Sequence, residues 1–354
     1  MPTSQRTFTL MIASPLEESF VSQIRAAAPS RVRVIHEPEL MPPTRYVADH
    51  KGPEDYQRAP QLERRWRSLL QEADILFDFP VSTIGDGSFQ AVAPNVRWVQ
   101  STSSGIGQLV KKIGLQNTDV IVTNAGGVHA TPLAEFVLMS LLIHAKRLHH
   151  LQSEQRQHRW QRFCGDDLEG KTLAIVGLGQ VGRRIAALAR NLGMRVIAFT
   201  RDVFPGREER DGVDAVYPPE RLPELIGQAY GVVLALPQTP ETEGLIDART
   251  IAAMQDGVVF INIARGICVD QNALLSALRS GRVGFAAMDV TDPEPLPPES
   301  PLWELPNVLI SPHSASTSFS ENGKIVEIFR HNLQCYLDGR LDEMRNVFNK
   351  ERLY

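Results

Sequence analysis

KTLAIVGLGQVGRRIAALA, at residues 171–189, decides the fold of the central part of the chain. An apolar strand ends in Gly177-x-Gly179-x-x-Gly182 and passes directly into a helix. The first glycine permits a tight turn, the second lets the backbone approach a pyrophosphate, and the third allows close packing of helix on strand. The helix N-terminus then faces the anion. The pattern predicts a dinucleotide site formed by Gly177, Leu178, Gly179, Gln180, Val181 and Gly182.

Further apolar segments follow this stretch at regular intervals. Strands are predicted at residues 172–176, 195–200, 231–236, 258–263, 284–290 and 308–311, with helices at 181–192, 222–228, 248–254 and 271–280 between them. Because each strand can join the next through a right-handed helical crossover, we expect a doubly wound parallel sheet.

The first 124 residues show a second α/β pattern. Strands are predicted at residues 7–13, 32–35, 75–79, 96–100 and 120–123. Residues 37–62 contain five prolines and are expected to form a long loop or an ordered excursion. Thr131-Pro132 predicts the start of a helix that runs to about residue 147, with threonine as the cap.

Composition narrows the class of protein. The 354 residues carry a net charge of −4, which leaves no basic excess for nucleic acid. The apolar stretch at 136–143 is too short for a membrane span, and the N-terminus lacks a secretory pattern. Three scattered cysteines fit a reducing compartment, so we expect a cytoplasmic protein. The histidines at 149, 150 and 158 lack a ligand spacing, so no metal is expected.

The second strand of the central unit ends in a way that bears on the cofactor. NAD sites usually carry an acidic residue here, whereas this chain has Thr200 followed by Arg201. A guanidinium suits a 2′-phosphate, which favours NADP(H) over NAD(H). In the alternative, Arg201 is a solvated loop residue, Asp202 takes the acidic role and the cofactor is NAD(H).

Four more segments follow the glycine loop in order. They are ALPQTPETEGLID at 235–247, FINIARGICVDQNALLSAL at 260–278, GFAAMDVTDPEPLP at 284–297 and LISPHSAS at 309–316. Together with the glycine loop, they resemble the signature blocks of the D-isomer-specific 2-hydroxyacid dehydrogenases, in particular glyoxylate and hydroxypyruvate reductases. The resemblance covers residues 168–316 closely and the first domain more loosely.

The resemblance implies the catalytic residues Arg265, Glu294 and His313. Each falls at or beyond the carboxyl end of a predicted strand, where open α/β sheets collect their ligands. His313 would exchange a proton with the substrate oxygen, Glu294 would hold its ring, and Arg265 would bind the substrate carboxylate. Taken singly, each residue also has an ordinary structural explanation, as a solvated or capping side chain.

Further contacts follow from the same resemblance. Ser104, Gly105 and Ile106, with Arg265, are expected to bind the substrate, although the loop could be an ordinary glycine turn. Asp289 is expected near the nicotinamide or as a cap of its loop. The other cofactor contacts implied are Leu236, Pro237, Ile263, Ala264 and Arg265.

The predicted fold is α/β with two Rossmann-like doubly wound domains. The cofactor domain, residues 125–313, is inserted into a discontinuous substrate domain formed by residues 1–124 and 314–354. A homodimer acting on a small anionic 2-keto or 2-hydroxy acid is implied, and the 41 residues after His313 leave little room for a regulatory domain. The side chain of the acid and the physiological direction are not predicted.

Two other functions stay open. One is a different enzyme on this scaffold, such as a phosphite or formate dehydrogenase, although Glu294 departs from the formate enzymes. The other is a cofactor-sensing regulatory protein of the corepressor type, which would keep the same residues without turnover.

Overall fold

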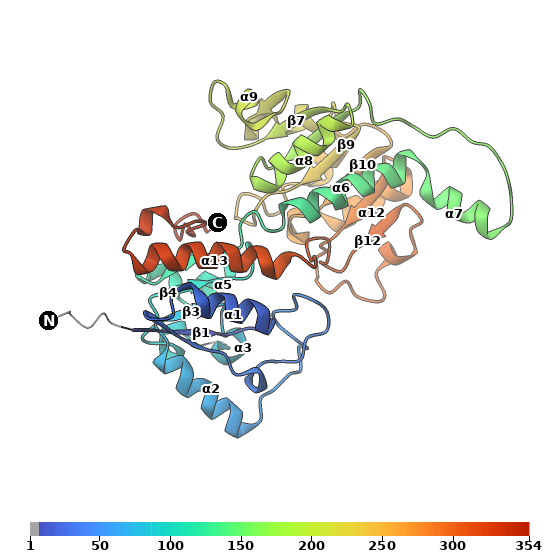
Figure 1. Cartoon of the computed structure of the whole chain (residues 1–354). Helices are drawn as coiled ribbons and strands as arrows, with labels where there is room; N and C mark the ends of the chain where they lie inside the picture. The colour runs from blue at the N-terminus through green and yellow to red at the C-terminus, as the bar shows by residue number, and fades with distance from the viewer. Residues whose placement is uncertain (1–6, 86, 354) are drawn as a thin grey trace. The chain divides into compact units, whose positions relative to one another are not determined.

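The computed structural model describes residues 7–85 and 87–353, and the chain divides into two compact units (Figure 1). Unit 1 comprises Met1–Val128 and Thr317–Tyr354, and unit 2 comprises His129–Ser316. Each unit is built on its own parallel sheet. The α/β fold predicted from the strand and helix pattern is therefore confirmed.

Unit 2 contains a seven-stranded sheet in the order β12-β11-β10-β9-β6-β7-β8. The strands are β6 (Thr172–Val176), β7 (Arg195–Phe199), β8 (Ala215–Tyr217), β9 (Gly231–Leu234), β10 (Val258–Asn262), β11 (Val283–Met288) and β12 (Val308–Ile310). The chain winds outward from β6 through β7 and β8, then returns to the other side of β6 at β9. This reversal is the position at which doubly wound sheets bind ligands.

Helices cover the two faces of this sheet. They are α6 (Ala130–Ala145), α8 (Gln180–Asn191), α9 (Arg207–Asp211), α10 (Leu222–Ile226), α11 (Ala248–Ala252) and α12 (Gln271–Ser280). A further helix, α7 (Leu148–Arg156), reaches away from the sheet (Figure 1). The sheet core is apolar throughout, as expected for parallel strands buried on both faces. The helix predicted from Thr131 begins at Ala130 with His129 in the cap position, so the prediction of a threonine cap was wrong.

Unit 1 contains a five-stranded parallel sheet in the order β2-β1-β3-β4-β5. The strands are β1 (Phe8–Ile12), β2 (Val32–Ile35), β3 (Ile75–Phe77), β4 (Trp98–Gln100) and β5 (Ile121–Thr123). The helices are α1 (Glu18–Ala27), α2 (Pro60–Glu72), α3 (Val81–Ile84), α4 (Phe89–Val92), α5 (Gly107–Lys112) and α13 (Glu321–Leu337). The strand order reverses beside β1, as in flavodoxin-like sheets.

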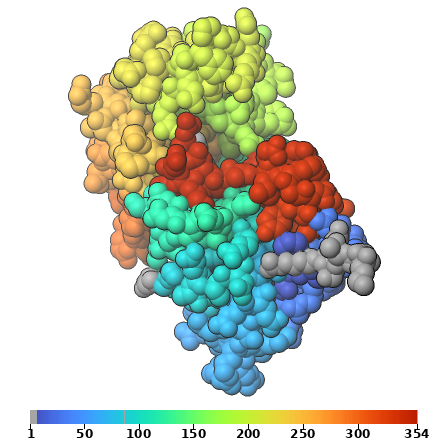
Figure 2. All heavy atoms as spheres, turned by 90° about the vertical axis from the view of Figure 1, so that its left-hand side faces the viewer, coloured from blue at the N-terminus to red at the C-terminus, as the bar shows by residue number. Residues whose placement is uncertain are grey.

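The C-terminal residues belong to the same unit as the N-terminal ones. Phe329 of α13 packs on Phe77 and Trp98, which are buried in strands β3 and β4. Beyond α13, the backbone N–H of Phe348 donates to the carbonyl of Val122 in β5 at 2.8 Å. Figure 2 shows this C-terminal segment in red beside the blue-to-teal N-terminal residues. Unit 1 is thus assembled from both ends of the chain.

The proline-rich segment after β2 is ordered by one buried carboxylate. Asp49 is 2% exposed and accepts hydrogen bonds from the backbone and guanidinium of Arg45, and from the N–H groups of Lys51 and Gly52. These contacts lower the pKa of Asp49 against the opposing effect of its burial. The segment is therefore an ordered loop, and its one short helical element before α2 is the 3-10 turn at Pro38–Leu40.

None of the helices in residues 7–85 and 87–353 has both the length and the apolar character that a membrane span needs.

Candidate active site

The glycine loop between β6 and α8 has the shape that a pyrophosphate requires. Gly177 has φ +114°, and a Cβ there would overlap the carbonyl oxygen of Ala235. A Cβ on Gly182 would overlap the carbonyl oxygen of Gly177, which keeps α8 close to the strand. A Cβ on Gly179 would meet nothing within 4 Å, so this exposed position leaves open space at the helix N-terminus. These residues fit a dinucleotide.

The other residues of the glycine loop differ in their exposure. Leu178 is buried at 4% exposure, Gln180 is exposed as the first residue of α8, and Val181 is half-buried. The buried leucine anchors the loop to the core of unit 2, while the open backbone at Gly179 faces solvent.

The end of β7 presents a cation beside this loop. Thr200 is half-buried, and its N–H donates to the carbonyl of Tyr217 at 3.1 Å. Arg201 is exposed, and its charge helps to lower the pKa of Glu241, which a hydrogen bond with Thr239 lowers most. Arg201 follows β7 and Glu241 follows β9, with β6 between them. Arg201 and Glu241 therefore follow the two strands that flank β6, and the glycine loop begins at the carboxyl end of β6.

Arg265 follows β10 and is positioned by a buried asparagine. Asn262 is fully buried, and its side chain bonds to the backbone of Ala264 and Arg265 at 3.0 and 3.1 Å. The Arg265 guanidinium donates to the Ala264 carbonyl at 2.6 Å. The next residue, Gly266, lies against Thr291, and a Cβ there would overlap the Thr291 carbonyl oxygen. The loops after β10 and β11 are therefore in direct backbone contact.

Asp289, at the end of β11, organises the segment that carries His313. Its carboxylate is 2% exposed and accepts from the Ser311 hydroxyl at 2.6 Å and the Ala315 N–H at 2.9 Å. Its carbonyl accepts from the His313 N–H at 2.9 Å. His313 itself has φ +54°, a conformation that non-glycine residues rarely adopt and that persists where surrounding contacts impose it.

His313 and Glu294 form the central pair of this site. The distance between His313 Nδ1 and Glu294 Oε1 is 2.6 Å, and both side chains are 42% exposed. With Nδ1 bonded to the carboxylate, Nε2 is the ring nitrogen left to exchange a proton with a ligand. Glu294 follows β11, the neighbour of β10, and His313 follows β12, the neighbour of β11. Adjacent parallel strands thus bring the loops of Arg265, Glu294 and His313 to one edge of the sheet.

The other sequence-predicted cofactor residues lie along the same edge. Leu236 and Pro237 follow β9, with Leu236 buried and Pro237 exposed, while Ile263 and Ala264 follow β10 and are buried. The backbone of Ala235 bonds to Val176 of β6 at 2.9 Å, which fixes the loop after β9 beside the glycine loop.

The Ser104 loop belongs to unit 1 and follows β4. Asp78, after β3 with φ +71°, accepts from the Thr102 N–H and hydroxyl at 3.3 and 2.9 Å. Ser104 and Gly105 are exposed, and Ile106 is buried and caps α5. The loop is therefore held at its base with exposed backbone at its tip.

Several residues that build the site escaped sequence reasoning. Ser311 and Asp78 each make a contact that joins neighbouring strand ends, while Asn262 holds the turn that carries Arg265. Their common signal is a polar residue directly at the carboxyl end of an apolar strand. No group of three histidine, cysteine, aspartate or glutamate side chains that could hold a metal occurs in residues 7–85 and 87–353.

The arrangement in unit 2 can bind a dinucleotide, bind an anion at a guanidinium and transfer a proton through an imidazole. The family model that matches the chain covers residues 138–315 and is described as "D-isomer specific 2-hydroxyacid dehydrogenase, NAD binding domain". This match contains every block quoted from the cofactor unit except for Ser316, the last residue of the final block.

Known proteins agree with this match. D-3-phosphoglycerate dehydrogenase of Mycobacterium leprae is 34% identical over 282 residues, which are 74% of this chain and 51% of that protein. The chain thus spans about half the length of that curated relative. Glyoxylate reductase of Korarchaeum cryptofilum is 31% identical over 299 residues, 83% of this chain and 88% of that enzyme. A similar solved structure is that of a D-isomer specific 2-hydroxyacid dehydrogenase from Xanthobacter autotrophicus in complex with NADPH and MES. The alignment covers 98% of this chain and 100% of that chain, with 27% sequence identity and a TM-score of 0.75.

Proposed function

The chain belongs to the D-isomer specific 2-hydroxyacid dehydrogenase family, and we propose that it is an NAD(P)-dependent oxidoreductase that interconverts a small 2-keto acid and its 2-hydroxy acid. The observation that carries the proposal is the 2.6 Å His313–Glu294 pair, one strand away from Arg265 on a sheet with a dinucleotide loop. The related enzyme from Korarchaeum is named a glyoxylate reductase, so a short 2-keto acid is the proposed substrate class.

The residues of unit 2 divide the chemistry among them. Glu294 holds the imidazole through Nδ1, so that Nε2 of His313 donates a proton to the substrate oxygen during reduction and accepts it during oxidation. Arg265 binds the substrate carboxylate and stabilises negative charge on the carbonyl oxygen. The nicotinamide cofactor, when bound, supplies or accepts the hydride. In unit 1, the loop of Ser104, Gly105 and Ile106 is proposed to bind the substrate carboxylate, with Ser104 and Gly105 at its exposed tip.

Asp289 has a positioning role in this proposal. Its carboxylate is engaged by Ser311 and Ala315, on either side of His313 along the chain. We therefore propose that it fixes the His313 segment, in addition to lining the nicotinamide side of the site. The glycine-loop residues Gly177 to Gly182 are proposed to bind the pyrophosphate, and Leu236, Pro237, Ile263 and Ala264 to line the rest of the cofactor site.

NADP(H) is the proposed cofactor in preference to NAD(H). Thr200 stands where a carboxylate would repel a 2′-phosphate, and the exposed Arg201 follows β7, the strand beside β6 and its glycine loop. The relative from Xanthobacter has NADPH bound. The test is the ratio of kcat/KM for NADPH and NADH in the wild type and in Arg201→Ala. We expect a wild-type preference that falls by about tenfold or more in the variant, because a charge-assisted contact is lost. Equal use of both cofactors by the wild type would refute the preference.

A homodimer is proposed from the exposed apolar surface of α6, α7 and the segment after them, here called the arm. Its exposed side chains are Met139, Leu142, Leu148, Leu151, Trp160 and Phe163, with Trp160 at 99% exposure. Figure 1 shows α7 and the chain after it reaching away from the sheet of unit 2. Apolar surface of this extent usually marks an interface.

The three thiols, Cys164, Cys268 and Cys335, are unpaired, which supports the proposal of a cytoplasmic location.

A further inference from the structure

A buried carboxylate in unit 2 lies close to three arginine side chains. The Asp211 side chain is 2% exposed and lies at the end of α9. Its oxygens are 2.6 Å from Arg207 Nε, 3.5 Å from Arg183 Nη1 and 3.8 Å from Arg210 Nε. None of these residues takes part in the chemistry described for the active site. A buried ion pair of this kind requires a full set of hydrogen bonds, and here the remaining donors have specific acceptors.

The remaining donors of Arg207 connect the two segments that would bind the cofactor. Arg207 Nη1 donates to the carbonyl of Asp202 at 2.8 Å, and Nη2 donates to the carbonyl of Leu178 at 3.4 Å. Leu178 lies inside the glycine loop, and Asp202 directly follows Arg201. Arg183 adds a second bond to the Leu178 carbonyl at 3.3 Å. One guanidinium therefore fixes the backbone beside the pyrophosphate site and the backbone beside the ribose.

Arg207 cannot itself be a ligand of the cofactor in this arrangement. Its side chain is 8% exposed, and Nε, Nη1 and Nη2 are all engaged within the protein. Arg201, by contrast, is exposed. The two arginines thus have different roles, one buried and directed into the protein and one presented to solvent.

We propose that the Arg207–Asp211 ion pair is a positioning device that sets the spacing between the glycine loop and Arg201, and so determines discrimination between NADP(H) and NAD(H). The inference rests on the proposed function, since it assigns a cause to the cofactor preference of that site. A 2′-phosphate is small and its contacts with a guanidinium are directional, so the position of the Arg201 backbone decides whether they form. NAD(H) lacks this group, so its binding does not depend on the position of Arg201.

The test replaces the pair with apolar residues of similar size, in Arg207→Met combined with Asp211→Leu. Such replacement of a buried ion pair is commonly tolerated, whereas removing one partner leaves an unpaired buried charge. Binding of NADP+, NAD+ and adenosine 2′,5′-bisphosphate is measured by titration calorimetry, without any need for turnover. Arg207→Lys is measured as a second variant, because it keeps the charge but cannot reach both carbonyls and the carboxylate together.

The expected result is a loss of discrimination. The affinities for NADP+ and adenosine 2′,5′-bisphosphate should fall by about tenfold in the double variant, and the affinity for NAD+ by less than about threefold. Arg207→Lys should give an intermediate loss of the same selectivity, and it decides the matter if the double variant does not fold. Unchanged NADP+ affinity, or equal losses for NADP+ and NAD+, would overturn the inference.

A matched control is available on the same unit. Arg221 and Glu224 form an exposed ion pair at 2.5 Å that does not contact the glycine loop. Arg221→Met combined with Glu224→Gln should leave all three affinities unchanged. Failure of the inference is distinguishable from failure of the proposed function: a wild type that reduces 2-keto acids while the double variant keeps its selectivity refutes only the inference. A wild type that binds neither nucleotide refutes both.

Discussion

His313 is held more firmly than an isolated loop histidine would be. Its backbone N–H bonds to Asp289, its ring bonds to Glu294, and its φ of +54° is maintained by these contacts. A residue in this conformation persists only where its surroundings determine it. The ring is therefore oriented before any ligand arrives, which is the condition for efficient proton transfer.

Glu294 provides the first prediction. Glu294→Gln keeps the size and a hydrogen bond at Nδ1 but removes the negative charge that balances the protonated ring. We expect kcat to fall by about 10- to 100-fold with little change in KM for the 2-keto acid, because ligand binding depends on other residues. Steady-state kinetics at saturating cofactor measure this. A variant that loses substrate affinity and keeps kcat would contradict a role for Glu294 in proton transfer.

Gly266 provides the second prediction at this scale. A methyl group there would overlap the Thr291 carbonyl, and neither backbone can move without separating the loops of Arg265 and Glu294. We expect Gly266→Ala to lower the free energy of unfolding by about 2 kcal/mol and kcat/KM by about 100-fold. Urea unfolding and kinetics test both effects. Gly323→Ala is the matched control. Gly323 lies in helix α13, and a Cβ there would meet only the Phe20 ring, at an ordinary contact distance of 3.6 Å. A Gly266→Ala variant as active and stable as this control would contradict the contact.

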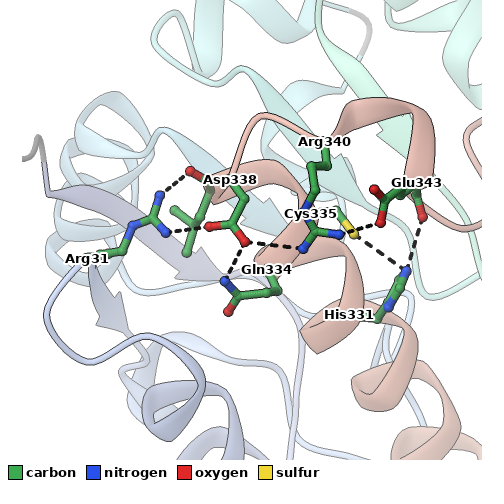
Figure 3. A network of polar contacts seen from close by, with 8 residues as sticks. Arg31, His331, Gln334, Cys335, Asp338, Arg340 and Glu343 are labelled. Atoms are coloured by element: carbon green, nitrogen blue, oxygen red, sulfur yellow. Dashed lines mark hydrogen bonds and ion pairs between the residues drawn. The ribbon is translucent and has the colours of Figure 1, made fainter.

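Among the secondary-structure elements, α13 returns the chain to unit 1 and ends in a polar network. Figure 3 shows this network, in which Asp338 accepts from Arg31 at 2.8 Å, Gln334 at 2.9 Å and Arg340 at 3.2 Å. His331 also lies in the network, 3.1 Å from the Glu343 carbonyl. Arg31 precedes β2, so the network joins segments from the two ends of the chain.

Asp338 makes the fold of unit 1 sensitive to acid. The bonds from Gln334, Arg31 and Arg340 lower the pKa of Asp338 from 3.8 to about 2. A lowered pKa in the folded state means that the ionised carboxylate stabilises the fold above the ordinary pKa. That stabilisation is lost as the pH falls from about 4 to about 2.

The corresponding variant is Asp338→Asn. Its Tm at pH 7 should be lower by about 2 °C, and the further fall in Tm between pH 4 and pH 2 should be smaller than in the wild type. Thermal unfolding followed by circular dichroism across this pH range is the measurement. If Tm depended on pH in the same way in both proteins, the ionisation of Asp338 would not contribute to the acid sensitivity of the fold.

The sequence was a good guide to elements with long apolar runs and a poor guide to short ones. The predicted strands of both sheets correspond to β1 to β7 and β9 to β12, because buried parallel strands are nearly continuous in Val, Ile, Leu and Ala. Strand β8, Ala215–Tyr217, was missed because it lies between charged segments. The helix at 130–145 was predicted, but it begins two residues earlier than the Thr-Pro signal indicates, so its cap was misplaced.

The candidate site shows a similar division. The residues at strand ends stand in recognisable blocks, so Arg265, Glu294 and His313 could be proposed together. The supporting contacts could not, since Asp289 and Arg207 bond to partners that lie far away along the chain. A carboxylate that bonds to residues 22 and 26 positions away leaves no local pattern.

At the scale of the whole molecule, the exposed apolar side chains of the arm indicate the proposed homodimer. Trp160 and Leu151 are exposed at 99% and 44%, which is unusual for side chains without a partner surface. Leu151→Arg combined with Trp160→Arg should convert the proposed homodimer into monomers, since charge is strongly disfavoured in the centre of an interface.

Sedimentation velocity of the wild type and this variant checks the prediction. Leu341→Arg is the control, because Leu341 is 45% exposed and lies in unit 1, outside the arm. A wild type that sediments as a monomer at micromolar concentration would refute the homodimer.

The central claim is that the chain reduces a 2-keto acid with His313 as the proton donor. The most direct measurement follows the loss of nicotinamide absorbance with NADPH and a panel of short 2-keto acids that includes glyoxylate and hydroxypyruvate. We predict turnover of at least one acid by the wild type, and a loss of about 100-fold or more in His313→Ala with unchanged NADPH binding. A wild type that binds NADPH but reduces none of these acids would contradict the claim and favour a cofactor-sensing protein.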